Sequence, residues 1–241
     1  MIVVSSSLGG EGVPSRFQTG AHNVSTVVDV WNGVRQAEIG SVIVDCLEDG
    51  VQEALREAGA YAVRTAPKDV LRLHNQESLS GMRRLAGTVT RFDRFCNHDL
   101  VINVPDGTVE LEPVHVQVLM YALASSDVGI ATFVIEEEPQ EGDDSSVFTS
   151  VAWNPARRVY VAPDCQIGTA MDFQRQPISF PGPPFFRHVP IFAYRRSVLD
   201  RLARVPPTGE DPETEIEILT ALRAGFRVEV CLITGDFTRI A

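Results

Sequence analysis

The sequence predicts an α/β protein built on a mostly parallel sheet, and three observations carry this prediction. Short β-branched runs alternate with helical patterns through the first half of the chain. Several of these runs, such as Asp99–Val104, are almost continuously apolar, which is typical of parallel strands covered on both faces. Closely spaced strand patterns after residue 147 indicate an antiparallel arm laid onto that sheet.

The first half supplies most of the predicted parallel sheet. We expect strands at Ile2–Ser5, Ser41–Asp45, Tyr61–Arg64, Asp99–Val104 and Gly129–Glu136. Helical spacing of apolar residues predicts helices at Val24–Ala37, Gly50–Ala58, Gly81–Thr88 and Val114–Ala124. Gly59 directly follows the second of these, where glycine commonly ends a helix.

The second half changes character after an acidic stretch, Glu136–Ser146, which we interpret as a solvated loop. Strands are predicted at Phe148–Trp153, Arg158–Val161, Thr169–Phe173, Arg187–Tyr194 and Phe226–Ile233, and helices at Ser197–Leu202 and Glu213–Ala224. The prolines of Ile178–Phe186 exclude regular structure there. We expect one domain, 1–241, with the antiparallel arm at about 147–195 inserted in it.

Composition and charge limit the function classes. The chain has 241 residues, with 32 acidic and 21 basic side chains and a net charge of -11. That balance argues against nucleic acid and anionic membranes as partners, since both need a basic face. The four cysteines form no CxxC pair, and the N-terminus lacks a basic signal region, so we expect a cytoplasmic protein.

Several motifs stand in a recognisable order along nearly the whole chain. They are Ser15-Arg16-Phe17, Ser80–Ala86 (SGMRRLA), Asn154-Pro155, Phe173–Ile178 (FQRQPI), Phe186–Arg195 (FRHVPIFAYR) and Pro212–Arg223 (PETEIEILTALR). No single match is decisive, but together they resemble the CMP-Kdo synthetase family of cytidylyltransferases. The resemblance implies a Rossmann-like fold of the nucleotide-diphospho-sugar transferase type, and homodimers formed partly through the arm. It also implies attack of a sugar acid's anomeric hydroxyl on the α-phosphate of CTP, with release of pyrophosphate and with Mg²⁺ as cofactor.

A triphosphate cradle is the first requirement of that chemistry, because the reaction depends on positioning and charge neutralisation. The resemblance places Arg16 in it as a catalytic and nucleotide-binding residue, but the family's early arginine and terminal lysine have no counterpart in the loop. Backbone amides of a glycine-rich loop can approach a phosphate closely. The nucleotide-binding candidates are therefore Gly9, Gly10, Gly12, Arg16, Ser80 and Gly81. A surface loop is the alternative for the glycines.

The metal carboxylates are the second requirement. Asp106 lies one or two positions from the family's magnesium-binding aspartate, and Asp236 follows the last strand, as a second family aspartate does. We therefore predict Asp106 and Asp236 as metal ligands, with Asp106 also catalytic. The alternative for Asp106 is ordinary turn chemistry in Pro105-Asp106-Gly107.

An acceptor pocket is the third requirement. The resemblance assigns His188 and Arg175 to substrate binding, and arginine suits a carboxylate through paired hydrogen bonds. Phe192 replaces a family tyrosine, and Thr220-Ala221 replace a Glu-Gln pair, so Kdo itself is not the expected substrate. Arg83 and Arg84 add positive charge near Gly81, with solvated helix charges as the alternative.

Three functions remain open from the sequence. The first is a cytidylyltransferase acting on a different acidic small molecule, with CTP or another nucleotide as its partner. The second is a catalytically inactive homologue that serves as a scaffold or as the partner of a related subunit. The third is a nucleotide-binding module without turnover.

Overall fold

A computed structural model describes residues 1–6, 24–47, 49–65, 81–106, 111–140, 146–175, 183–206 and 217–233. The strands are β1 (Ile2–Ser5), β2 (Val42–Cys46), β3 (Ala62–Arg64), β4 (Leu100–Pro105), β5 (Ile130–Glu136), β6 (Phe148–Arg158), β7 (Gln166–Gln174), β8 (Phe186–Arg195) and β9 (Val228–Leu232). The helices are α1 (Val24–Arg35), α2 (Asp49–Glu57), α4 (Gly81–Phe92), α5 (Pro113–Ala122), α6 (Arg196–Leu202) and α7 (Glu217–Arg223). No helix among these residues is long and apolar enough to cross a membrane.

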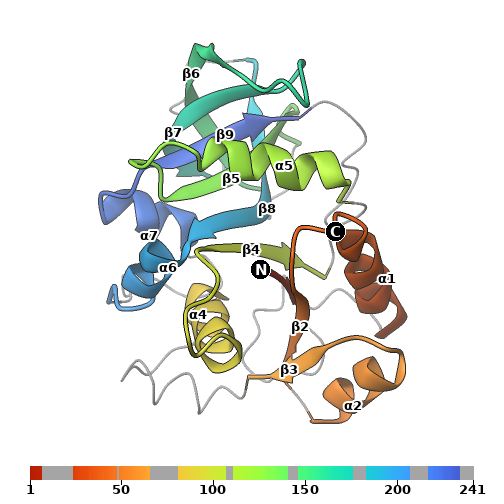
Figure 1. Cartoon of the computed structure of the whole chain (residues 1–241). Coiled ribbons are helices and arrows are strands. Elements are labelled where there is room, and N and C mark those ends of the chain that lie inside the picture. Colours follow the sequence, from red (N-terminus) through yellow and green to blue (C-terminus); the bar gives the residue numbers. More distant parts are fainter. Residues whose placement is uncertain are drawn as a thin grey trace.

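The strands form one mixed sheet in the order β3-β2-β1-β4-β8-β5-β9-β7-β6 (Figure 1). β1 pairs in parallel with β2 and β4, β2 with β3, and β5 with β9. β8 enters between β4 and β5 in the opposite direction, and β7 returns antiparallel to β6 and β9. The predicted fold, a mostly parallel sheet carrying an antiparallel arm, is confirmed.

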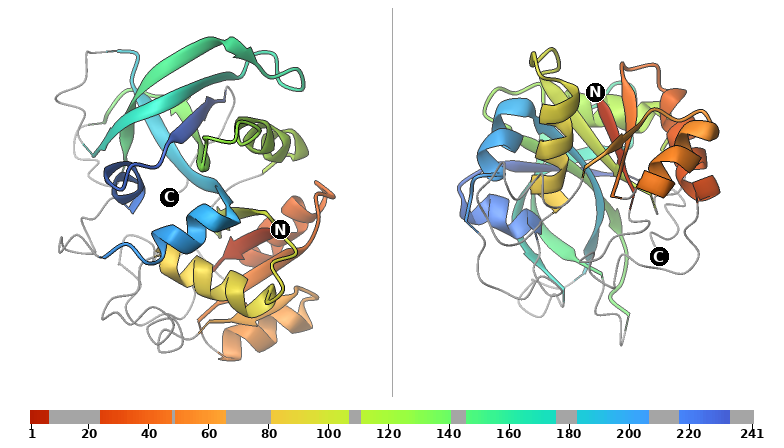
Figure 2. Two further views of the ribbon diagram at one scale, coloured as in Figure 1. Left: turned by 60° about the vertical axis from the view of Figure 1, so that its left-hand side comes forward. Right: turned by 90° about the horizontal axis from the view of Figure 1, so that it is seen from below.

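Helices cover both faces of the sheet, because successive strand residues point to opposite sides. Val3 of β1 packs with residues of α4, α6 and α7, whereas Ile2 and Val4 pack on the face that α1, α2 and α5 cover. Figure 2 shows the two helix layers on either side of the strands. Strands buried on both faces explain the nearly continuous apolar runs in the sequence.

The arm differs from the prediction in one respect. A separate strand at Arg158–Val161 was expected, but β6 continues from Phe148 through Arg158, and the chain then turns back into β7. The pairing of β6 with β7 shifts register between Trp153 and Arg158. Pro155 lies inside this interruption and has no N–H to donate to a neighbouring strand, so the local pattern resembles the end of a strand.

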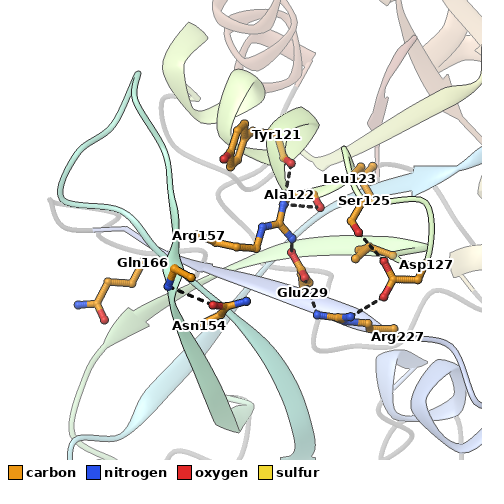
Figure 3. A network of polar contacts seen from close by, with 12 residues as sticks. Tyr121, Ala122, Leu123, Ser125, Asp127, Asn154, Arg157, Gln166, Arg227 and Glu229 are labelled. Carbon is orange, nitrogen blue, oxygen red and sulfur yellow. Dashed lines mark hydrogen bonds and ion pairs between the residues drawn. The ribbon is translucent and has the colours of Figure 1, made fainter.

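A buried ion-pair network fastens the arm to the rest of the sheet (Figure 3). Arg157 of β6 pairs with Glu229 of β9, and its Nη2 donates to the carbonyl oxygens of Tyr121 (3.0 Å) and Ala122 (3.2 Å). A cation is favourable at the C-terminal end of α5, because the last helical carbonyls have no partner within the helix. Glu229 also accepts from Arg227 at 3.0 Å and is only 1% exposed. Burial raises the pKa of Glu229, against the opposing effect of the arginines.

The network predicts an unequal response to the loss of its two carboxylates. Glu229→Ala leaves Arg157 buried beside carbonyl oxygens without its counter-charge, and we expect a loss of about 3–5 kcal/mol in the free energy of unfolding. Asp127→Ala removes a carboxylate that pairs with Arg227 but is 55% exposed, so it should change stability little. Urea unfolding of both variants measures the difference. Equal destabilisation would show that the buried pair does not anchor the arm.

Candidate functional site

The candidate site lies where the order of the sheet reverses. The chain runs from β1 outward through β2 and β3, and then returns to place β4 on the other side of β1. In α/β sheets of this kind, ligands bind outside the carboxyl ends of the strands at such a switch point. The last residues of β1 and β4 are therefore the first place to look for chemistry.

Polar groups meet at this switch point. The N–H of Asp106 donates to the carbonyl oxygen of Ser5 (3.1 Å), and the Ser5 hydroxyl donates to the side-chain oxygen of Asn103. Asp106, the predicted metal ligand, is only 4% exposed and directly follows β4. The Ser5 hydroxyl and the Asn103 amide thus meet near the ends of β1 and β4, and the backbone of Asp106 is bonded to the same end of β1. Asp106 also stands in a turn, so the turn interpretation and the site interpretation are compatible.

A second polar cluster, next to the first, was not predicted as a site. Asp45 ends the apolar run of β2 and is fully buried, and its Oδ2 lies 2.6 Å from Nε of Arg84 on α4. Burial raises the pKa of Asp45, and the Arg84 charge opposes this effect, together with the hydroxyls of Thr65 and Thr88. The sequence does contain a feature that could identify Asp45 as a site residue, because this carboxylate follows the apolar run Val42–Val44 near the carboxyl end of a predicted strand.

The solvated-charge interpretation of the two adjacent arginines is wrong. Arg83 is 5% exposed and donates to the Val205 carbonyl oxygen at 2.7 Å, and the Arg84 side chain is 12% exposed. Gly81, a predicted nucleotide-binding residue, begins the same helix. The remaining predicted cradle and metal residues lie outside the described residues, namely Gly9, Gly10, Gly12, Arg16, Ser80 and Asp236.

His188 lies on β8, beside a bulge that Pro190 helps to explain. The pairing of β5 with β8 shifts between Thr132 and Phe133, so that Thr132 pairs with Phe192 while Phe133 pairs with Val189. Pro190 falls in the unpaired stretch, where its missing N–H costs no ladder bond. The Thr132 hydroxyl lies within the bulge, 2.8 Å from the Ile191 carbonyl oxygen and 3.1 Å from that of Val189.

The same hydroxyl fixes the state of the imidazole. Nε2 of His188 lies 2.9 Å from Oγ1 of Thr132. Because the hydroxyl has one proton and faces carbonyl acceptors, we assign the donated proton in this contact to the imidazole Nε2. Burial lowers the pKa of His188 to about 3, helped by the charge of Arg187; the ring of Phe173 packs edge-on against the imidazole, and that of Phe192 packs at a tilt. His188 is therefore a neutral, buried donor and supplies no positive charge to an acid.

Strand register brings the predicted acceptor residues to the same edge as Asp106. Phe192 pairs with Asn103, and β8 runs antiparallel to β4, so His188 lies toward the carboxyl end of β4. Phe148 pairs with both Gln174 and Arg187, which places Arg175 and His188 about two strand spacings apart, roughly 10 Å. The structure thus gathers Asp106, His188 and Arg175 at one edge of the sheet.

Comparison with known proteins gives the same picture over the full length. No family model matches the chain. It is 29% identical over 234 residues to the 3-deoxy-manno-octulosonate cytidylyltransferase of Rhodospirillum centenum, which covers 97% of this chain and 85% of that protein. It is also 29% identical to the enzyme of the same name from Methylorubrum extorquens strain PA1, over 97% and 88% of the two chains.

Two solved structures share this arrangement of helices and strands. A CMP:2-keto-3-deoxy-manno-octonic acid synthetase complexed with CTP aligns with a TM-score of 0.70 at 22% identity, over 97% of this chain and 90% of that one. A UDP-glucose pyrophosphorylase complexed with UDP-glucose aligns with a TM-score of 0.58 at 8% identity, over 98% and 91%.

The fold is that of the nucleotide-diphospho-sugar transferases. Within that class, the chain is similar over 97% of its length, at 25–29% identity, to enzymes named 3-deoxy-manno-octulosonate cytidylyltransferase, the CMP-Kdo synthetases. The resemblance read from the sequence motifs is confirmed.

The buried imidazole predicts a pH effect on stability. The unfolded chain protonates His188 near its ordinary pKa of about 6.5, whereas the folded protein resists protonation down to about 3. Stability is therefore lost as pH falls from about 6.5, at up to about 1.4 kcal/mol per pH unit from this residue alone. The difference in unfolding free energy between the wild type and His188→Gln, measured from pH 7 to 4, isolates this contribution. A difference that does not change with pH would contradict the burial of a neutral imidazole.

Proposed function

We propose that this protein is a cytidylyltransferase that transfers CMP from CTP to an acidic small molecule, with release of pyrophosphate. The observation that carries the proposal is the position of Asp106 at the switch point between β1 and β4, beside Ser5 and Asn103. His188 and Arg175 lie on the same edge of the sheet. Similarity to 3-deoxy-manno-octulosonate cytidylyltransferases over 97% of the chain supports the nucleotide and the reaction type.

Mg²⁺ fits the chemistry of the donors at the switch point. It prefers oxygen ligands and keeps several waters, so one or two carboxylates suffice to hold it. Asp106 would be one ligand and Asp236, outside the described residues, the second; the described part of the chain contains no cluster of three metal-binding side chains. When bound, Mg²⁺ would neutralise charge on the phosphates of the nucleotide.

The chain's own groups would hold the rest of the nucleotide. The segment that follows Ser6 carries Gly9, Gly10, Gly12 and Arg16, whose amides and guanidinium would contact the triphosphate. Gly81 begins α4 and, with Ser80 before it in the sequence, would complete the nucleotide site.

The acceptor side points to an acid other than Kdo. Arg175 would bind its carboxylate in a bidentate manner, and neutral His188 would keep the wall of the site in place through Thr132. Phe192 lies against His188 with a ring distance of 5.1 Å and offers no hydroxyl to a sugar. We therefore propose an acidic acceptor with fewer hydroxyl contacts than Kdo would require.

The arm supports a second proposal about assembly. Tyr160, Val161 and Met171 of the arm are 89%, 54% and 64% exposed, and apolar side chains this exposed favour contact with another protein. We propose a homodimer through the arm, or a pair with a related subunit, in a single-domain cytoplasmic protein. If turnover is absent, such a subunit would act as a scaffold or a nucleotide-binding partner.

Nucleotide binding and turnover can be tested separately. Millimolar CTP with Mg²⁺ should raise the melting temperature, because a ligand at 100 times its Kd stabilises the folded state by about 2.7 kcal/mol. Pyrophosphate release over a panel of sugar acids and related acids should then reveal the acceptor. Asp106→Asn should lower release at least about 100-fold by weakening charge stabilisation, whereas Asp164→Asn, in the exposed turn of the arm, should not change it.

The outcomes separate the candidate functions. The absence of any shift with CTP would overturn both the enzyme and the nucleotide-binding proposals and leave the scaffold. A shift without release across the acid panel would favour the binding module. Release that survives unchanged in Asp106→Asn would remove Asp106 from the metal site.

A further inference from the structure

The guanidinium of Arg84 connects α4 to the ends of two parallel strands. Nε lies 2.6 Å from Oδ2 of Asp45, and Nη2 donates to the carbonyl oxygens of Ser6 (2.6 Å) and Asp45 (3.1 Å). The N–H of Ser6 in turn donates to the Asp45 carbonyl oxygen at 2.8 Å. The Arg84 side chain thus holds Ser6, the residue that follows β1, against the end of β2.

The cluster is dry and its charges are balanced. Asp45 is fully buried, Ser6 is 0% exposed and the Arg84 side chain is 12% exposed, so the Arg84–Asp45 pair is largely shielded from water. Thr65 and Thr88, whose hydroxyl oxygens are 2.5 Å apart, lie beside the carboxylate and extend the contact from β3 to α4. Breaking such a pair by removing one partner leaves an uncompensated buried charge, which is strongly destabilising.

The position of Ser6 gives this cluster a role in the reaction. Ser6 is the last residue before the glycine-rich segment that is proposed to cradle the triphosphate, and Ser5 contacts Asp106 at the switch point. Gly81, proposed to contact the nucleotide, lies one helical turn before Arg84. The cluster therefore connects the three parts of the proposed nucleotide site, which are the start of the glycine-rich segment, the switch point with Asp106 and the start of α4.

We propose that Arg84 is a positioning residue for nucleotide binding, with Asp45 as its partner. It fixes the point at which the chain leaves β1 relative to α4 and Asp106, and it acts through Ser6 without touching the nucleotide. Its charge is matched by Asp45, so it does not serve as one of the cations for the triphosphate. This inference rests on the proposed nucleotide-dependent function.

The geometry requires an arginine. A planar guanidinium can reach the carboxylate through Nε and the two carbonyl oxygens through Nη2 at once, whereas a lysine ammonium is a compact charge that cannot span these positions. Arg84→Lys therefore keeps the positive charge and removes the planar guanidinium that reaches several acceptors at once. Arg196→Lys is a matched control, because Arg196 is also buried and pairs with Asp200 (3.1 Å) and Asp93 (3.5 Å). It lies at the opposite edge of the sheet, where its N–H donates to the Asp99 carbonyl oxygen.

The first measurement needs no ligand. Amide hydrogen exchange of Ser6 and Asp106 in the free protein should accelerate at least about tenfold in Arg84→Lys but not in Arg196→Lys, because local opening at β1 becomes easier. Asp45→Asn should have the same effect as Arg84→Lys and serves as the second variant if one of them folds poorly. Unchanged exchange at Ser6, or equal acceleration in the Arg196→Lys control, would overturn the positioning role.

The second measurement connects the cluster to the nucleotide. At a temperature where all variants are folded, the Kd for CTP with Mg²⁺ should rise at least about tenfold in Arg84→Lys and stay near the wild-type value in Arg196→Lys. Wild-type affinity in Arg84→Lys would overturn the inference while leaving the proposed function in place. A wild type that binds no CTP would overturn the proposed function, and the exchange experiment then decides the role of Arg84 at Ser6 by itself.

Discussion

The parallel pairing of β1 with both β2 and β4 is the constraint on which the rest of the structure depends. It brings the carboxyl ends of three strands to one edge, so that Asp45, Ser6 and Asp106 lie near one another although they are far apart in sequence. The reversal of β8 between β4 and β5 then brings His188 to that edge from the opposite chain direction. Without this register, the polar residues that end each strand would be unrelated surface groups.

Arginine, rather than lysine, compensates the carboxylates that this arrangement buries. Lys68 is the only lysine among 21 basic residues, and Asp45, Asp93 and Glu229 each pair with an arginine. A guanidinium can form an ion pair with a carboxylate and donate to nearby carbonyl oxygens at once, as Arg84 and Arg157 both do. The same type of arginine–carboxylate pair therefore stabilises both the end of β1 and the attachment of the arm.

The fold was largely predictable, because parallel strands buried on both faces are recognisable in the sequence as nearly continuous apolar runs. Most strand runs, the helix periods within the described residues and Gly59, which adopts a positive φ after α2, agreed with the structure. The end of β6 was not predictable, because Pro155 breaks the local pattern while distant pairing with β7 continues the strand. For the site, the sequence indicated Asp106, but the role of Arg84 depends on Ser6 and Asp45, which only the tertiary structure brings to it.

Charge balance at the sheet edge constrains how a triphosphate could bind there. Arg84 is matched by Asp45 and Arg187 by Glu137 at 2.9 Å, and burial keeps His188 neutral. These three groups therefore contribute little net positive charge to a ligand that carries about four negative charges. In the proposed function, neutralisation would come from Arg16, from Mg²⁺ held through Asp106, and from backbone amides of the glycine-rich segment. Because these three described groups contribute little positive charge, the position of each amide matters more, and that position depends on where the chain leaves β1.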